Sequence, residues 1–212
     1  MGDRLVVAAF DFDGTLTHHD SVVPFLRRVA GTGRLVTGLV RNFRRLVPAI
    51  LRRDRDALKA LATKVTFTGR QYDEIVRHAD EFAAHVITDG LRADTVARLR
   101  WHLDEGHTVL IVSASYEPYV RVVGHHLGVH EVLATRLETV SAGSVTGRLD
   151  GRNCRGPEKV ARLDQWLTLN ETSRSEISLW AYGDSAGDRD LLAIADHPVW
   201  VKGPLASVAP TL

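Results

Sequence analysis

Residues 5–15 read LVVAAFDFDGT, and this stretch decides the fold of the 212-residue chain. An apolar run of this length with β-branched residues indicates a buried strand that ends at Asp11. Ligands of open parallel α/β sheets bind at the carboxyl edge of the strands, and Gly14 lets the backbone turn sharply there. Two buried carboxylates are unfavourable unless a divalent cation or a lysine offsets their charge. We therefore expect a functional site at Asp11 and Asp13, although Asp and Gly also favour an ordinary turn.

Two later apolar runs also end in polar side chains. Ile111-Val112 leads into Ser113, which we interpret as the last residue of a second strand, and the run 179–182 leads into Gly183-Asp184. Asp188 follows four residues later, and Lys159 lies between the two runs in a stretch of helical pattern. Each residue also has an ordinary interpretation, as a strand-end serine, a solvated lysine or aspartates at a helix N-terminus. Their order along one chain favours a shared site.

The bulk composition is that of a soluble globular protein. Hydrophobic residues make up 44% of the chain, which is long enough for one medium domain or a core with a smaller insertion. The opening apolar run is too short for a signal peptide and no membrane span is visible, so we expect no export. The single cysteine, Cys154, excludes a disulfide within the chain and fits a cytoplasmic location.

Positive charge is concentrated in one segment. Nine arginines and a single acid, Asp54, lie between Arg27 and Arg55, whereas the whole chain has a net charge of only +1. Apolar residues recur there at helical spacing, and Pro48 is expected to kink or break the helix. Three interpretations stay open: peripheral contact with an anionic membrane, attraction of a soluble polyanion, or a solvated face. We do not expect nucleic acid as a partner, because Phe43 is the one aromatic residue of this segment available for stacking.

The remaining pattern predicts a helical insertion within an α/β core. In residues 18–86 no strand pattern appears, and helices are expected from 22 to 29, from 35 to about 52, from Asp54 or Asp56 through 65, and from 72 to 86. Strands then alternate with helices; the strands are expected at 107–112, 132–140, 145–149, 177–182 and 199–201, and the helices at 93–103, 119–127, 157–167 and 188–195. We expect an α/β fold with a Rossmann-like three-layer core and a mainly parallel sheet, formed by residues 1–17 and 87–212, plus a helical cap at 18–86.

The ordered set of strand ends, with Lys159 before the last one, resembles the haloacid dehalogenase superfamily of phosphatases. Within it the chain is most similar to the phosphoserine phosphatase-like subgroup, in which a small helical cap follows the first motif. The core matches almost completely, through Asp11, Asp13, Ser113, Lys159 and Asp184. The insertion matches by position and helicity. The resemblance implies a Mg²⁺-dependent phosphatase that acts on a small phosphorylated substrate.

The resemblance also implies a role for each residue. Asp11 is the nucleophile that forms an aspartyl-phosphate, and Asp13 protonates the leaving oxygen and later activates water. The phosphate is bound by Gly14, Thr15, Ser113, Ala114 and Lys159. Mg²⁺ is held by Asp11, Asp184 and the backbone carbonyl of Asp13, with Asp188 supporting them.

Two positions depart from the subgroup. Asp20 stands where those enzymes carry a glutamate that meets the substrate amine, and Gly187 stands where they carry asparagine. We keep Asp20 as a substrate-binding candidate, but its shorter side chain argues against phosphoserine itself. Whether His18 or His19 touches substrate stays open, and His102, His107, His125 and His126 are expected at the surface.

We therefore expect hydrolysis of a small phosphate monoester. One alternative is a phospholipid or lysophospholipid head-group phosphatase, brought to the membrane by the segment Arg27–Arg55. An alternative of another class is a phosphate-binding regulatory module without turnover. The presence of both candidate reacting acids, Asp11 and Asp13, favours an enzyme, because a binding module has no need of the pair.

Overall fold

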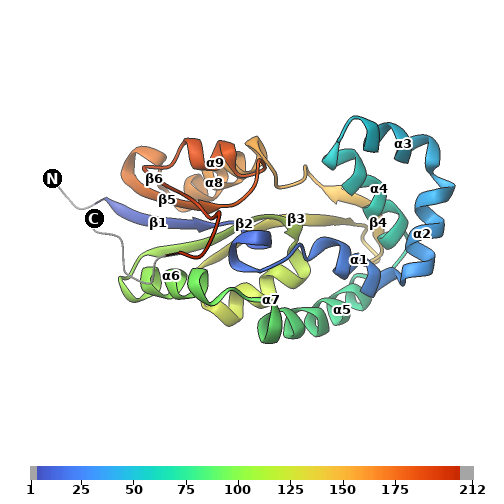
Figure 1. The fold of residues 1–212 in the computed structure, drawn as a ribbon, viewed down its shortest axis with the longest axis horizontal. Helices are drawn as coiled ribbons and strands as arrows, with labels where there is room; N and C mark the ends of the chain where they lie inside the picture. Colours follow the sequence, from blue (N-terminus) through green and yellow to red (C-terminus); the bar gives the residue numbers. More distant parts are fainter. Residues whose placement is uncertain (1–3, 206–212) are drawn as a thin grey trace.

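A mostly parallel sheet forms the centre of the molecule (Figure 1). The computed structural model describes residues 4–205, so the predicted core ends at 1–3 and 206–212 lie outside it. The strands are β1 (Leu5–Phe10), β2 (Thr108–Tyr116), β3 (Glu131–Thr139), β4 (Val145–Asp150), β5 (Ile177–Gly183) and β6 (His197–Trp200). Their order is β4-β3-β2-β1-β5-β6, and only the β3–β4 hairpin pairs antiparallel among them. This confirms the predicted mainly parallel α/β sheet.

Helices cover both faces of the sheet. Figure 1 shows α6 (Ala93–Asp104) and α7 (Glu117–Leu127) on one side and α8 (Pro157–Leu169) and α9 (Arg189–Ala193) on the other. Successive side chains of a strand point to opposite faces of the sheet, so β1 contributes to both layers. Ala8 and Phe10 pack into the apolar cluster beneath α6 and α7, whereas Val7 and Ala9 pack into the cluster beneath α8 and α9. The three-layer core expected from the sequence is confirmed.

Five helices lie in residues 18–86, which we call the helical segment. They are α1 (Val22–Ala30), α2 (Thr32–Arg41), α3 (Phe43–Leu51), α4 (Arg55–Phe67) and α5 (Tyr72–His85), and they gather at one end of the sheet (Figure 1). Helix α4 contacts β4 and α5 contacts α7. Aromatic rings strengthen this junction: the centroid of Phe25 lies 4.7 Å from that of Tyr119, and that of Phe67 lies 5.2 Å from that of Tyr116.

The two connections between the core and the helical segment lie side by side. Thr17 forms an isolated antiparallel bridge with Leu91. The His18 N–H donates to the Gly90 carbonyl, and the Arg92 N–H donates to the Leu16 carbonyl, each at 2.9 Å. The chain therefore leaves and returns to the core at nearly the same place.

The helix predicted from 35 to about 52 is divided into α2 and α3, but the break does not lie at Pro48 as expected. Pro48 lies inside α3, and the chain instead turns at Asn42, where φ is −100° and ψ is 26°. The Asn42 side-chain amide donates to the Gly38 carbonyl at 2.8 Å, so it satisfies a helix-end acceptor and stabilises the turn. Helix α4 begins as expected, because Asp54 accepts a hydrogen bond from the Ala57 N–H at 2.9 Å.

Two other expectations about the core were wrong. His102 is fully buried, because Tyr182 and His107 supply partners for its two ring nitrogens, each at 2.9 Å. Ser113 does not end its strand: β2 runs on to Tyr116, and its pairing with β3 changes register between these two residues.

Candidate active site

A buried lysine joins two aspartates at the carboxyl edge of the sheet. Asp11 directly follows β1, and its N–H donates to the Tyr182 carbonyl of β5 at 2.9 Å. Lys159, on the first turn of α8, is only 1% exposed, and its Nζ donates to Asp11 Oδ1 and Asp188 Oδ1 at 2.6 Å each. Burial alone lowers the pKa of Lys159, but Asp11 and Asp188 raise it above its usual value. The ammonium therefore stays charged.

The carboxyl group of Asp13 is fixed by two serines. Its Oδ1 accepts from the N–H of Ser21 at 3.0 Å and from the Ser21 hydroxyl at 2.5 Å, and its Oδ2 accepts from the Ser115 hydroxyl. Burial raises the pKa of Asp13 to about 6, although the hydrogen bonds from Ser115 and Ser21 oppose this rise. The side chain is thus held in one orientation beside Asp11.

Gly14 allows the loop after β1 to pass close to Asp184. Its φ is +77°, and a Cβ atom at this position would lie 2.3 Å from Asp184 Oδ2. A larger residue would therefore be strained and would also collide with the carboxylate. This explains why the turn after Asp13 carries glycine.

Three carboxylates at this edge form a candidate cation site. Oxygen atoms of Asp11, Asp184 and Asp188 lie within 4.8 Å of one another. Burial raises the pKa of Asp11 to about 7, and burial followed by the charge of Asp188 raises that of Asp184. Asp184 Oδ1 is buried without a hydrogen-bond partner among residues 4–205. An orphaned carboxylate oxygen within an all-oxygen donor set fits a hard cation such as Mg²⁺.

Asp188 differs from the other two acids because both of its oxygens already have partners. Oδ1 accepts from Lys159, and Oδ2 accepts from the N–H of Ser185 at 2.9 Å and from its hydroxyl at 2.8 Å. Asp11 and Asp184 are consequently the freer donors, and Asp188 is suited to hold Lys159 and the loop in place.

These residues open into a cavity of about 700 Å³ that we call the edge cavity. Its core wall includes Asp11, Asp13, Gly14, Ser113, Ala114, Lys159, Asp184 and Asp188. Thr15 is fully buried and does not belong to this lining. The Ser113 hydroxyl accepts the Ser115 N–H at 3.0 Å. All but Thr15 of the residues assigned through the resemblance are thus brought to one cavity.

The helical segment supplies the facing wall. His18, His19 and Asp20 line the cavity just after the first loop, and Asp20 also accepts from the Val23 N–H at 3.2 Å at the start of α1. Leu26 and Leu39 add apolar surface. Asp20 therefore lies at the cavity while it caps a helix.

Sequence reasoning missed Lys59, Ser21 and Ser115. Lys59 of α4 lines the edge cavity, donates to the Ala114 carbonyl and lies 4.3 Å from the centroid of the Tyr116 ring. Burial lowers its pKa to about 7. Nothing in the sequence separates Lys59 from a solvated helix lysine. Ser115 had a signal, because it lies two residues beyond Ser113 and alternate residues of a strand share a face.

Acids and a buried lysine that gather at a cavity on the edge of a three-layer α/β fold are the features of an enzyme active site. The chain belongs to the haloacid dehalogenase-like hydrolase family, whose model matches residues 8–193.

Relatives agree with this assignment. The chain is 38% identical to Protein CicA of Caulobacter vibrioides over 198 residues, covering 93% of this chain and 86% of the relative. It is 28% identical to phosphoserine phosphatase SerB1 of Mycobacterium tuberculosis, covering 94% and 66%. A substrate-bound phosphoserine phosphatase structure shares the fold with a TM-score of 0.61 at 16% identity, covering 91% and 84%. The chain is an enzyme of the phosphatase type within its family.

Proposed function

We propose that the chain hydrolyses a phosphate monoester with the help of Mg²⁺ and through an aspartyl-phosphate on Asp11. One observation supports this above all: Lys159 is buried between Asp11 and Asp188, while Asp184 beside them keeps a buried oxygen without a partner. This arrangement supplies a nucleophile, a fixed cation and a place for a second cation at one strand edge.

In this mechanism Asp11 attacks with the oxygen that does not accept from Lys159. A new bond forms between that oxygen and phosphorus, and the bond between phosphorus and the leaving oxygen breaks. Asp13 gives its proton to the leaving oxygen, and later takes a proton from the water that attacks the aspartyl-phosphate. Ser21 and Ser115 keep the Asp13 carboxyl in position for both transfers.

The phosphoryl oxygens need several positive or donor groups. Asp11, Asp184 and the carbonyl of Asp13 would hold Mg²⁺, which when bound neutralises negative charge on the phosphoryl group. Lys159 supplies a second fixed charge. Donors from Ser113 and Ala114, with the backbone N–H of Gly14, would complete the set of groups that bind the phosphate.

We also propose that residues 18–86 act as a cap over the core formed by 1–17 and 87–212. Leu26, Leu39 and Lys59 of the helical segment face the acids across the edge cavity. Such a wall would exclude bulk water from the reacting groups during phosphoryl transfer.

Phosphate release from p-nitrophenyl phosphate tests this function. We expect release that requires Mg²⁺, stops with EDTA and falls by about a thousandfold or more in Asp11→Asn, because the nucleophile is lost. Asp104→Asn, which changes an acid outside the edge cavity, is the matched control and keeps its activity. Equal rates for the wild type and Asp11→Asn would disprove the mechanism.

The natural ester is sought with a panel of phosphoserine, sugar phosphates, lysophosphatidate and phosphatidylglycerophosphate. SerB1 is named for phosphoserine. The short side chain of Asp20 has less reach toward a substrate amine than glutamate. We therefore expect phosphoserine to be a poorer substrate than an ester without an amine.

Exposed apolar side chains favour a second candidate, a phosphatase of lipid head groups. Six large apolar side chains on α2 and α3 are between 48% and 77% exposed: Val36, Val40, Phe43, Val47, Ile50 and Leu51. Arg41, Arg44 and Arg45 lie among them, in a stretch that has no acid before Asp54. A basic, amphipathic surface of this kind suits the interface of an anionic bilayer. Within residues 4–205, no helix is both long and apolar enough to cross the bilayer.

Vesicle sedimentation distinguishes this candidate. We expect binding to phosphatidylglycerol vesicles but not to phosphatidylcholine vesicles, and about tenfold weaker binding for Phe43→Ser combined with Leu51→Ser. Leu169→Ser removes an equally exposed apolar side chain on α8 and serves as the control. Loss of binding in both the double variant and Leu169→Ser, or in neither of them, counts against a bilayer contact through α2 and α3.

A further inference from the structure

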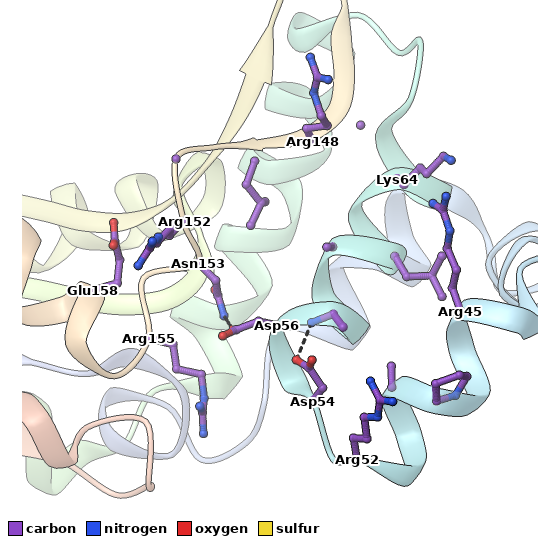
Figure 2. Close-up of a pocket in the computed structure, with 18 of the residues that line it drawn as sticks. Arg45, Arg52, Asp54, Asp56, Lys64, Arg148, Arg152, Asn153, Arg155 and Glu158 are labelled. Carbon is purple, nitrogen blue, oxygen red and sulfur yellow. Dashed lines mark hydrogen bonds between the residues drawn. The ribbon is translucent and has the colours of Figure 1, made fainter.

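A second, larger cavity lies beside the edge cavity and is rich in positive charge. Its volume is about 1340 Å³, and we call it the basic cavity. Figure 2 shows Arg45, Arg52 and Lys64 on the wall made by α3 and α4, and Arg152 and Arg155 on the facing wall after β4. In all, seven basic and three acidic side chains line it. The lining therefore has a positive field that attracts anions.

The acids of the basic cavity already have partners. Asp54 accepts from the Ala57 N–H at 2.9 Å, and Asp56 accepts from the Asn153 amide at 2.6 Å, as the dashed lines of Figure 2 mark. Glu158 pairs with Arg162 at 3.2 Å. The acids are thus engaged in holding the two walls and the helices.

The cations, in contrast, are largely unpaired. Among residues 4–205, no ion pair involves the side chains of Arg45, Arg52, Lys64, Arg152 or Arg155. Guanidinium groups form charge-assisted, often bidentate hydrogen bonds with phosphate and carboxylate groups. Arg44 has no ion pair either, so within residues 4–205 six of the seven cations of this lining lack an ion-pair partner and are available to an anion.

The position of the basic cavity connects it to the reaction. Asn153 and Arg155 line both cavities, so the two adjoin at these residues. Between the charged groups, the wall of the basic cavity contains apolar surface from Pro48, Leu61 and Leu149. A ligand that reaches from one cavity to the other would meet acids and Lys159 at one end, pass Asn153 and Arg155, and meet arginines with apolar surface among them at the other end.

We infer that the basic cavity binds the leaving-group part of the substrate and selects esters that carry a second anionic group. This inference rests on the proposed phosphatase activity and names its substrate class: a phosphomonoester with a further phosphate or carboxylate, separated from the ester by a spacer that spans the two cavities. The second anion can belong to a soluble molecule or to a lipid head group with a phosphodiester. Both present the same chemistry to Arg45 and Arg152.

A ladder of alkanediol bisphosphates tests the inference. The bisphosphates of butane-1,4-diol, hexane-1,6-diol and octane-1,8-diol are compared with the monophosphates of the same chain lengths. We expect kcat/KM to be about tenfold higher for the best bisphosphate than for its monophosphate. The preferred length reports the span between the cavities. A preference no greater than the statistical doubling for two equivalent phosphates, at every length, overturns the inference.

Variants assign the preference to the basic cavity. Arg45→Gln combined with Arg152→Gln is expected to reduce the ratio of bisphosphate to monophosphate kcat/KM to the statistical value. Arg41→Gln changes an exposed arginine of α2 that lines neither cavity, and it keeps the wild-type ratio. An unchanged ratio in the double variant would contradict the assignment.

Binding to Asp11→Asn separates this inference from the activity itself. Calorimetry compares hexane-1,6-bisphosphate with hexyl phosphate in this variant, with and without the two arginine substitutions. Tighter binding of the bisphosphate that depends on both arginines supports the inference even if no ester is hydrolysed, and equal binding overturns it. Phosphatidylglycerophosphate in mixed micelles, which carries a monoester and a diester, then shows whether a lipid or a soluble ester is preferred.

Discussion

The edge cavity and the basic cavity adjoin but treat charge in opposite ways. At the edge cavity, Lys159 is buried and bonded to Asp11 and Asp188. At the basic cavity, Arg45 and Arg152 are exposed and have no ion pair within residues 4–205. A buried charge must be compensated inside the fold, whereas water compensates an exposed one. The charges of the edge cavity are therefore compensated within the folded core, whereas the cations of the basic cavity remain available to a ligand.

Removing one charge from each cavity gives the largest expected contrast. Lys159→Met leaves Asp11 and Asp188 uncompensated in the interior, so we expect the free energy of unfolding to fall by about 3–5 kcal/mol. Arg45→Met removes an exposed cation and should change it by no more than about 0.5 kcal/mol. Urea unfolding in EDTA, followed by circular dichroism, measures both. Similar losses in the two variants would break the distinction between the cavities.

Two glycines with similar backbone conformations extend the contrast. Gly14 has φ of +77° and ψ of −14°, and Gly128 has φ of +78° and ψ of 22°, but a Cβ atom would collide with another group, Asp184, only at Gly14 of these two. We expect Gly128→Ala to lower the free energy of unfolding by about 1 kcal/mol through backbone strain. Gly14→Ala should lower it by about 2–3 kcal/mol, because the collision with Asp184 adds to that strain. Thermal and urea unfolding of both variants compare strain alone with strain plus collision.

Buried groups of the core should also make stability depend on pH. Burial, followed by the charges of His107 and Arg98, lowers the pKa of His102 to about 3 from an ordinary 6.5. Between these values the unfolded chain binds more protons, so His102 reduces stability as pH falls, by up to about 1.4 kcal/mol per pH unit. We expect His102→Gln to remove this slope, measured as the difference from wild type in urea unfolding at several pH values. His126→Gln, at an exposed position, should leave the slope unchanged, and a slope that persists in His102→Gln refutes the assignment.

The smallest effect is expected where polar groups join the walls of the basic cavity. Asn153→Ala removes the hydrogen bond to Asp56, which is exposed to water. We expect the free energy of unfolding to change by no more than about 0.5 kcal/mol. A loss comparable to that of Lys159→Met would mean that the walls are held together by this bond and that the basic cavity is as preorganised as the edge cavity.

The sequence predicted the core because local patterns determine it. Residues 5–10 alternate between two apolar faces once helices cover both sides, and the strand end then places Asp11 at the edge. The break between α2 and α3 was harder to predict, because Pro48 is the stronger local signal. Asn42 prevails through a side-chain hydrogen bond that depends on the conformation of the turn.

The grouping of the candidate site residues could be predicted to the extent that they follow strands or resemble family motifs. Asp11, Lys159 and Asp184 come from three distant parts of the chain, yet each follows a recognisable pattern. Lys59 and Ser21 have no such pattern, since they reach the site through the packing of helices against the core. His102 was placed at the surface because its partner Tyr182 lies 80 residues away in sequence.

The side-by-side connections at Thr17 and Leu91 have a consequence for how the chain folds. β1 and β2 are parallel neighbours, yet about 100 residues separate them, and closing so long a loop slows folding in a disordered chain. We expect helices α1 to α5 to form early from local contacts, and the bridge between Thr17 and Leu91 brings the two ends of their segment together. Formed helices shorten the loop that joins β1 to β2, so residues 18–86 should slow the pairing of these strands less than a disordered loop of the same length would.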